Sequence, residues 1–484
     1  MKDVLKSIDY KKVFHYFEEI SSVPRGSKDN QGISDYLVQF AKDHNLAYRQ
    51  DEALNVVMVK EATKGYEDKE TVMLQGHMDM VCLAESGVEH DFTKEGLDLY
   101  IDGDYIKARG TTLGGDNGIA IAMSLAILDN DELVHPRLEV VITTDEEIGL
   151  LGAAALDASD LKAKYLINLD SEAENAITVG CAGGMTSICS IPVEYRKQSG
   201  DRIDITIRGL QGGHSGAEIT KNRTNSNILM GRMLTELENK EAFEVIHMEG
   251  GSKDNAIPNE SIVSIVVNDG AKDHVIASIK ELEAVYKSEL HSAEPGFNIM
   301  IEEGPQGEFD VLTNQSFEKI LLFMSYTPNG IQVMSADIEG LVESSLNLGI
   351  LVMDDKEVSF SYSVRSSVAS YKEYLSNKLC LLAEFLGGSY TFEGSYPGWE
   401  FKQDSKLRSV MEELYEKEFG RKPVIEVIHA GLECGLLLEK MPELDIVSIG
   451  PDMNDIHTPQ EALSISSTKR MFDFVLTTLE ALCK

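Results

Sequence analysis

Residues 71–79 are TVMLQGHMD, an apolar stretch that ends in glycine, histidine and aspartate. The same pattern recurs three times, in LEVVITTDEE (138–147), YLINLD (165–170) and DIVSIGPDMNDIH (445–457). Short apolar runs that end in polar residues predict buried strands. Because segments with helical periodicity separate these runs, the sequence predicts an α/β domain with a mixed, mostly parallel sheet covered by helices.

The rest of the chain divides into two styles of structure. Residues 1–188 and 395–484 are expected to form the α/β catalytic domain in two parts. Segment 189–394, called the lid below, has the order strand, helix, strand, strand, helix, strand, followed by a second unit of similar order. This order predicts an inserted α+β lid domain made of two ferredoxin-like units. The expected strands of the first unit are 203–208, 243–248, 261–267 and 297–302, and those of the second are 331–336, 345–353, 357–364 and 389–393.

Length, charge and cysteine content limit the classes of protein. The chain has 484 residues, and at roughly 150 residues per domain it is long enough for two or three domains. Its 81 acids and 44 bases give a net charge of −37, which disfavours nucleic acid and anionic membranes as partners. Its six cysteines form no C-x-x-C pair, and neither a signal peptide nor a membrane-spanning stretch is apparent. We therefore expect a cytoplasmic protein with reduced thiols.

Polar side chains follow each of the four apolar runs. His77 and Asp79 follow the first, Glu146 and Glu147 the second, Asp170 the third, and His457 the fourth. The glycine-rich segment RGTTLGGDNG (109–118) places Asp116 just before an expected helix. Open α/β sheets bind ligands at the carboxyl ends of their strands, so these side chains are expected to meet at one edge of the sheet.

The residue types indicate a metal site. Imidazole and carboxylate ligands suit zinc, with manganese or cobalt as alternatives. Five ligands are too many for one tetrahedral zinc with an open position, but they fit two ions about 3.5–4 Å apart that share a carboxylate and a nucleophilic hydroxide. Asp79 can accept the second ring N–H of His77 and orient it. Glu146 and Glu147 are adjacent and must point differently, so one can bind metal while the other acts as general base.

Five motifs carry a resemblance to a known family. QGHMDMV, LGGDNGIA, TTDEEIG, INLDSE and DIHTPQE, in this order, resemble the dinuclear zinc peptidases that include aminoacylase, carboxypeptidase G and bacterial dipeptidases. RGTTLGGDNG, HAGLECG and GPDMNDIHTP more narrowly resemble aminoacyl-histidine dipeptidases, a branch of that family that cleaves Xaa-His dipeptides. The resemblance runs over nearly the whole chain. It implies His77 and Asp170 on one metal, Glu147 and His457 on the other, Asp116 bridging them, Asp79 behind His77, and Glu146 as general base and proton shuttle.

The resemblance also assigns residues of the lid. It implies that His214, in the turn GGHSG, reaches over the active site and stabilises the oxyanion of the tetrahedral intermediate. Asn255 in KDNAIPNE and Arg365 in SYSVRSS resemble residues that hold the substrate C-terminus, which a guanidinium can bind through two hydrogen bonds. Gly431 and Glu433 of HAGLECG are expected to line the substrate cleft.

The second lid unit bears on assembly. In shorter relatives, a single lid unit pairs with that of a second subunit. Here the second unit of the same chain could take that part. We therefore expect each chain to complete its own active site, so that a homodimer, where it forms, is not needed for catalysis.

Together these features predict a cytoplasmic metallopeptidase that uses two divalent ions to cleave dipeptides, Xaa-His and β-Ala-His among them. One alternative is an N-acyl-amino-acid deacylase of the same superfamily. Another is a non-catalytic peptide-binding protein, although Glu146 beside five ligands is hard to explain without catalysis. Two other functional motifs are excluded. GHSG is not a nucleophile elbow, because Ala217 stands where its last glycine would be, and LGGDNG is not a P-loop, because no lysine follows it.

Overall fold

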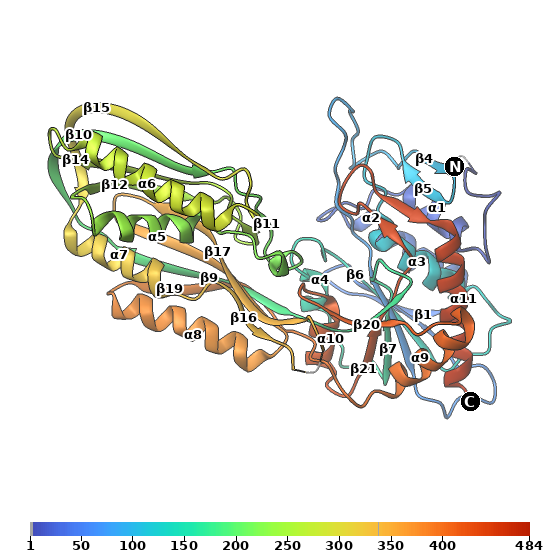
Figure 1. Ribbon diagram of the computed structural model, residues 1–484. Coiled ribbons are helices and arrows are strands. Elements are labelled where there is room, and N and C mark those ends of the chain that lie inside the picture. The colour runs from blue at the N-terminus through green and yellow to red at the C-terminus, as the bar shows by residue number, and fades with distance from the viewer. Residues whose placement is uncertain (1–2, 337) are drawn as a thin grey trace. The chain divides into compact units, whose positions relative to one another are not determined.

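The chain forms two compact units. A computed structural model describes residues 3–336 and 338–484. Unit 1 comprises residues up to Cys181 together with Trp399–Val427 and Leu432–Lys484, and unit 2 comprises Ala182–Gly398 and Ile428–Gly431 (Figure 1). The chain therefore crosses between the units at 181/182 and 398/399, where junctions after 188 and 394 were expected. A second pair of crossings, around Ile428–Gly431, was not anticipated.

Unit 1 is built on an eight-stranded sheet, which confirms the expected α/β architecture. Its strand order is β1-β2-β6-β3-β7-β21-β8-β20. The four apolar runs form its centre, where β3 is parallel to β6 and β7, and β7 is parallel to β21. The strands are β1 (Ala47–Gln50), β2 (Val56–Lys60), β3 (Val72–His77), β6 (Leu138–Thr143), β7 (Tyr165–Asn168), β8 (Ala176–Cys181), β20 (Val424–Ile428) and β21 (Asp445–Ser448).

The outer strands of this sheet were not all foreseen. The sequence analysis did not predict β1, β8 or β20. β1 has an almost fully exposed pattern and β20 an exposed to half-buried one, so neither shows the apolar run of a buried strand. A separate four-stranded sheet, β22-β23-β5-β4, lies in the same unit. Its strands are β4 (Leu99–Asp102), β5 (Tyr105–Ala108), β22 (Met453–Asn454) and β23 (Ala462–Ser464).

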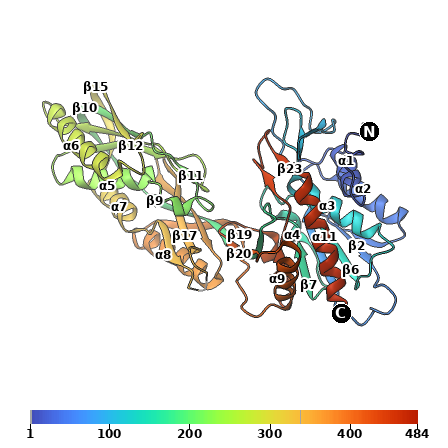
Figure 2. The same cartoon turned by 45° about the vertical axis from the view of Figure 1, so that its right-hand side comes forward.

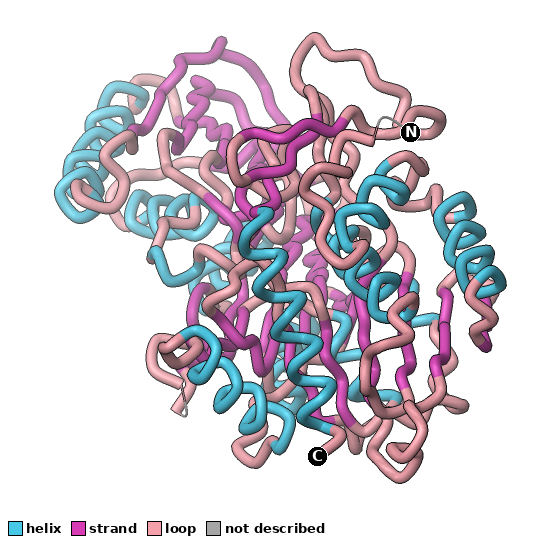
Figure 3. The backbone as a smooth tube through the Cα atoms, turned by 90° about the vertical axis from the view of Figure 1, so that its right-hand side faces the viewer, coloured by secondary structure: helices cyan, strands magenta, loops and turns pink. Residues whose placement is uncertain are grey.

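Helices cover both faces of the eight-stranded sheet. A side chain at Gly76 would meet Asn117 and Ala120 of α3, whereas the neighbouring Gln75 is hydrogen-bonded to Glu433 of α10. Successive residues of a strand point to opposite faces, so α3 and α10 lie on opposite sides of β3. In Figure 3 the long C-terminal helix α11, which ends near the C label, lies in front of the sheet and runs roughly along its strands. The helices are α1 (Val13–Ser21), α2 (Gln31–Asp43), α3 (Gly115–Leu128), α4 (Leu151–Ala155), α9 (Lys406–Phe419), α10 (Glu433–Lys440) and α11 (Ile465–Leu482).

Unit 2 contains one continuous nine-stranded sheet. Its order is β15-β10-β14-β12-β17-β18-β9-β19, with β16 added beside β17. Four helices line one side of this sheet (Figure 2) and share one apolar core with it. The elements are β9 (Gly183–Pro192), β10 (Tyr195–Arg208), α5 (Ser226–Glu238), β12 (Glu244–Gly250), β14 (Ser261–Val267), α6 (Lys272–Leu290), β15 (Asn298–Leu312), α7 (Asn314–Tyr326), β16 (Gly330–Met334), β17 (Val342–Met353), β18 (Glu357–Ser366), α8 (Ala369–Phe385) and β19 (Ser389–Tyr396). The pair β11 (Gly213–His214) and β13 (Ala256–Ile257) and the short helix η1 (Ile219–Lys221) complete the unit.

The two halves of this sheet have the same order of strands. The first half contains strands 1 to 4 in chain order, which are β10, β12, β14 and β15, and from the edge of the sheet inward they lie in the order 4-1-3-2. The second half contains β9, β17, β18 and β19, and from the opposite edge inward they lie in the same order. This is the strand order of a ferredoxin-like unit. The expected second unit was wrong in one respect, because its first strand is β9 rather than a strand after α7. β9 precedes the whole first unit in the chain, so the first unit is nested within the second. The two halves meet where β12 pairs with β17.

Among the described residues, no helix is long and apolar enough to cross a membrane.

The contact between β3 and α3 yields a first prediction. A Cβ at Gly76 would lie 2.5 Å from the Ala120 Cβ and still closer to the Asn117 side chain. We expect Gly76→Ala to lower the free energy of unfolding by about 1–3 kcal/mol, because overpacking forces the strand and helix apart. Chemical denaturation in the presence of a chelator measures this loss without a contribution from bound metal.

Gly32→Ala is the matched control. A Cβ at Gly32, in helix α2, would have no neighbour closer than 3.5 Å. Alanine there should leave stability unchanged or raise it slightly, since alanine favours helix. An equal loss in both variants would contradict a steric cause at Gly76.

Candidate metal centre and active site

The candidate ligands gather at one edge of the unit 1 sheet. His77 is the last residue of β3, and the parallel register places it beside Thr143, the last residue of β6. Glu146 and Glu147 follow β6, and Asp170 follows β7, whose Asn168 pairs with Gln75. Parallel strands end at the same edge of a sheet, so the side chains that follow β3, β6 and β7 lie close together at that edge.

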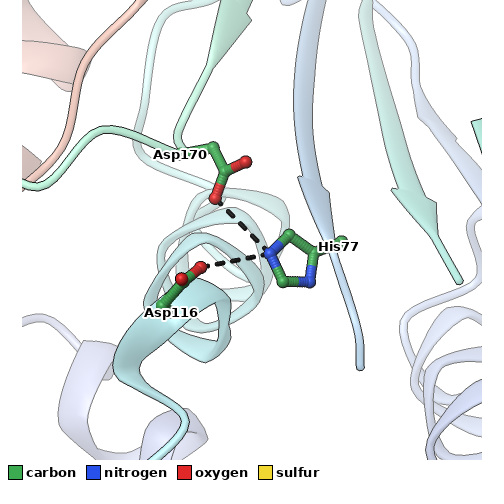
Figure 4. A group of neighbouring side chains, drawn as sticks. All are labelled: His77, Asp116 and Asp170. Atoms are coloured by element: carbon green, nitrogen blue, oxygen red, sulfur yellow. Dashed lines mark hydrogen bonds and ion pairs between the residues drawn. The ribbon is translucent and has the colours of Figure 1, made fainter. Parts of the chain in front are cut away.

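The first group of ligands surrounds one nitrogen of His77. Its Nε2 lies 3.1 Å from Oδ1 of Asp116 and 3.5 Å from Oδ1 of Asp170. Figure 4 shows the three side chains converging from β3, α3 and the segment after β7. The His77 side chain is 1% exposed, and the three ligand atoms lie within 4.8 Å of one another. Such a group could hold one divalent ion.

The second group shares Asp116 with the first. Nε2 of His457 lies 3.0 Å from Oδ2 of Asp116 and 3.0 Å from Oε2 of Glu147. Asp116 therefore turns one carboxylate oxygen toward His77 and the other toward His457. This is the geometry expected of a carboxylate that bridges two ions.

Asp79 lies behind His77. Its Oδ1 is 3.3 Å from Nδ1 of His77, and its two oxygens accept hydrogen bonds from the backbone N–H groups of Glu146 and Glu147. Ser27 donates a further hydrogen bond through its hydroxyl. Burial opposes ionisation, but the hydrogen bonds from His77, the Glu146 backbone and Ser27 outweigh it and lower the pKa of Asp79. Asp79 is thus an ionised group that can orient the His77 ring.

Glu146 and Glu147 differ in their surroundings. Glu147 belongs to the group with Asp116 and His457, whereas Glu146 joins a group with His77 and Glu147. Burial raises the pKa of Glu146 well above its usual value, and the nearby Asp170, Glu433 and Glu147 raise it further. A carboxyl group in such surroundings holds a proton readily, as a general acid or base must.

The electrostatics of the centre favour positive charge at the two histidines. Burial opposes a charge on His77, but Asp170, Asp116 and Asp79 outweigh it and raise its pKa. Hydrogen bonds to Asp116 and Glu147 raise the pKa of His457 to about 11. Buried carboxylates that are not balanced by cations are costly. The number of acids, the imidazole donors and the spacing therefore fit two divalent cations.

The lid histidine has a defined protonation pattern. His214 lies in β11, which pairs with β13, and its Nδ1 accepts hydrogen bonds from the backbone N–H groups of Gly216 and Ala217 at 3.3 and 3.0 Å. Burial and the charge of Arg365 lower its pKa, so the ring is neutral near pH 7. Because Nδ1 accepts, the proton of the neutral ring is on Nε2. His214 therefore presents an N–H donor.

Arg365 is a buried cation in the same unit. It lies on β18, is 7% exposed, and donates from Nη1 to the Tyr396 hydroxyl at 3.4 Å, while its Nε has no partner. Within residues 3–336 and 338–484, no carboxylate forms an ion pair with its guanidinium. An unpaired buried charge is unfavourable, so this arrangement suits an anionic ligand.

His429 is a neighbour that the sequence analysis missed. Its Nε2 lies 2.7 Å from the Ser345 hydroxyl, and burial and Arg365 lower its pKa to about 4. A Cβ at Gly216 would lie 2.5 Å from the His429 carbonyl, 3.0 Å from Cε1 of His214 and 3.2 Å from Nε of Arg365. Glycine thus allows these groups to pack around one point. The only sequence feature that could have pointed to His429 is its place as the first residue of the motif HAGLECG.

Asn255 of the lid and Gly431, which also belongs to unit 2, lie near this cluster. The carbonyl of Asn255 accepts a hydrogen bond from Ser215 N at 2.9 Å, and its side chain is exposed. A Cβ at Gly431 would come within 2.7 Å of the Tyr396 ring, whose hydroxyl meets Arg365. The structure therefore brings His214, Asn255, Arg365 and Gly431 into one region of unit 2.

Three buried charges of unit 1 were unassigned or missed. Glu433 accepts hydrogen bonds from Gln75 and Thr143, and burial raises its pKa to about 7. Arg25 and Glu461 contact the segments that carry the ligands and received no role. In sequence, Arg25 and Glu461 resemble ordinary surface charges, since nothing local marks a charged residue that tertiary packing will bury.

Comparison with known proteins agrees with this geometry. The sequence profile of peptidase family M20/M25/M40 matches residues 73–481. The chain is 36% identical over 465 residues to the cytosol non-specific dipeptidase of Escherichia coli, covering 96% of each chain. It superimposes on the crystal structure of aminoacylhistidine dipeptidase from Vibrio alginolyticus with a TM-score of 0.89, at 36% identity, covering 97% of this chain and 96% of that one. An aminopeptidase of Bacillus cereus shares the fold at a TM-score of 0.56 and 16% identity.

The family profile matches most of the chain, and the Escherichia coli relative is 36% identical over 96% of each chain. Together these two matches show the family. The chain belongs to peptidase family M20/M25/M40.

Proposed function

We propose that this protein is a dipeptidase that depends on two divalent metal ions and that accepts Xaa-His dipeptides, β-Ala-His included. The observation that carries the proposal is the carboxylate of Asp116, whose two oxygens face His77 and His457 separately. Two related proteins support the choice of substrate, since one is named a non-specific dipeptidase and the other an aminoacylhistidine dipeptidase.

The proposed ligands divide into two sets. His77 and Asp170 would hold one ion, Glu147 and His457 would hold the other, and Asp116 would be shared between them. Zinc suits this mixture of imidazole and carboxylate, and manganese or cobalt could replace it. When bound, such ions polarise the scissile carbonyl and lower the pKa of water.

Glu146 is proposed to move the proton. Its pKa is raised by burial, so its carboxylate can take a proton from water during attack and return it to the leaving amine. Asp79 holds His77 in the tautomer that presents Nε2, because its carboxylate faces Nδ1. These two acids thus have separate tasks in proton transfer and orientation.

The cluster in unit 2 is proposed to bind the substrate. Arg365 binds the free carboxylate of the dipeptide, and Asn255 and Gly431 shape that subsite. His214 stabilises the developing oxyanion through Nε2–H, a role for which a neutral ring with an accepting Nδ1 is suited. A requirement for a free carboxylate explains why this buried arginine has no acidic partner among the described residues.

We also propose that the protein works in the cytoplasm. The six cysteines are all free thiols, which suits a reducing compartment, and the Escherichia coli relative is named a cytosol dipeptidase.

Replacing the proposed general base tests the mechanism. Glu146→Gln keeps the size of the side chain and removes its capacity to accept a proton. We expect both ions to remain bound and kcat to fall by about 10²–10⁴-fold. Steady-state kinetics with elemental analysis of the same sample measures both quantities. Near-normal turnover with both ions bound would refute the assignment.

Arg365 provides a test of carboxylate recognition. Arg365→Met should lower kcat/KM for a dipeptide by roughly 10- to 100-fold, since hydrogen bonds to charged groups contribute about 1.5–3 kcal/mol. The matched control is the dipeptide amide, which lacks the charge on the substrate. Wild-type protein should disfavour the amide by a similar factor, and the variant should not. Additive losses in the variant with the amide would show that Arg365 acts elsewhere.

Metal removal and a substrate panel test the activity itself. Protein stripped with a chelator should be inactive, and zinc, manganese or cobalt should restore hydrolysis. β-Ala-His and ordinary dipeptides should be cleaved, while tripeptides and acetyl amino acids should be poor substrates. Preference for acetyl amino acids would instead identify a deacylase, and full activity in metal-free protein would contradict the proposal.

A further inference from the structure

Two buried charged residues of unit 1 lie beside the candidate centre without belonging to it. Arg25, in the segment between α1 and α2, is 2% exposed, and Glu461, just before β23, is 3% exposed. Buried charges of this kind are retained only where hydrogen bonds satisfy them. Their side-chain hydrogen bonds run to the backbone of the segments that carry Asp116 and His77.

Glu461 binds the backbone at the start of α3. Its Oε2 accepts from Leu113 N and Gly114 N at 2.8 and 2.9 Å, and its Oε1 accepts from Gly115 N and Asp116 N at 2.8 and 3.3 Å. The carboxylate thus satisfies four backbone N–H groups of the irregular segment that leads into α3, where Asp116 itself has non-helical φ and ψ. Because Glu461 lies four residues after His457, it ties the His457 segment to the Asp116 segment.

Arg25 binds the other side of the same loop. Its Nη1 donates to the carbonyls of Met78 and Asp79 at 3.1 and 3.4 Å, and its Nη2 donates to the carbonyl of Gly114. Its own carbonyl accepts from Met80 N at 3.1 Å. Arg25 therefore ties the segment that follows His77 to the Asp116 segment.

The glycines of LGGDNG make room for this arrangement. Gly114 has a φ of +63°, and a Cβ there would meet the Arg25 guanidinium and lie 2.6 Å from the Met80 sulfur. A Cβ at Gly118 would lie 2.6 Å from Nη2 of Arg25. The glycine-rich motif thus admits a buried guanidinium from a remote segment, which gives it a purpose other than phosphate binding.

We propose that Arg25 and Glu461 are positioning residues that place the Asp116 carboxylate between two ions, each residue serving a different ion. Arg25 joins the segments of His77 and Asp116, so it supports the ion held with Asp170. Glu461 joins the segments of His457 and Asp116, so it supports the ion held with Glu147. The inference rests on the proposed dinuclear centre.

The test compares metal binding in wild type, Glu461→Gln and Arg25→Lys. Glutamine keeps one carbonyl oxygen but turns an NH₂ group toward two of the four N–H donors. Lysine keeps the charge but cannot donate to both segments in the same geometry. Loss of a hydrogen-bonding partner behind a ligand typically weakens metal binding by about 10–100-fold. Competition with a chromophoric chelator for zinc measures the two stepwise affinities.

The position of the weakened ion decides the assignment. In crystals equilibrated with limiting zinc, anomalous scattering should show lower occupancy beside His457 in Glu461→Gln and beside His77 in Arg25→Lys. Saturating zinc should return kcat to within a few-fold of wild type, because Glu146 and the ligands are intact. Because bound zinc also stabilises the folded state, thermal unfolding of the metal-free variants measures separately any loss of stability.

Glu139→Gln is the matched control. Glu139 is a fully buried carboxylate of β6 that accepts from Arg137, Lys162 N and Ala163 N, so it resembles Glu461 in burial and partners. It lies near the start of β6, and the proposed ligands follow the opposite end of that strand. This variant should lose stability, measured by thermal unfolding of the metal-free protein, but keep both affinities.

Three outcomes would count against the inference. Unchanged zinc affinities in both Glu461→Gln and Arg25→Lys would overturn it while leaving the dinuclear centre intact. Equal weakening of both ions in every variant, Glu139→Gln included, would show a general structural effect and overturn it as well. Fewer than two ions in the wild-type protein would overturn the proposed centre itself and this inference with it.

Discussion

The carboxylate of Asp116 has to lie between two imidazoles that are 380 positions apart in the sequence, His77 and His457. Each oxygen faces one ring, so a small displacement of the start of α3 would disturb both groups of ligands at once. The sheet supplies His77 and Asp170 through strands that end at the same edge, but α3 approaches that edge from one face. Hydrogen bonds from the buried side chains of Arg25 and Glu461 hold the backbone of Gly114 and Gly115, where α3 begins.

The two units have opposite electrostatic preferences. In unit 1, acids gathered at the edge of the sheet raise the pKa of both histidines and favour cations there. In unit 2, burial and Arg365 lower the pKa of His214 and His429. The two neutral rings lie beside an arginine that forms no ion pair with any acid in the described part of the chain. That cluster favours an anion.

The nested duplication in unit 2 shows where local patterns stop being informative. Helix and strand order along the chain predicted two repeated units, and the structure contains two sets of strands in the order 4-1-3-2. The second set begins with β9, which the chain forms before any part of the first set. An apolar sequence indicates that a strand is buried, but it does not indicate which strand will be its partner in the sheet. Pairing of β9 with β18 joins residues more than 150 positions apart, and no turn between them records the choice.

The central strands and the polar residues that follow them were accessible from sequence, because strand burial and the turn after a strand are local properties. His77, Asp79, Asp116, Glu146, Glu147, Asp170 and His457 follow from that pattern together with resemblance to a family. Arg25, Glu461 and His429 were not accessible. A charged or imidazole side chain looks the same in sequence whether it lies in water or in the interior. Only long-range packing, which brings Arg25 beside Gly114 and Glu461 beneath Asp116, gives these residues their environment and hence their chemistry.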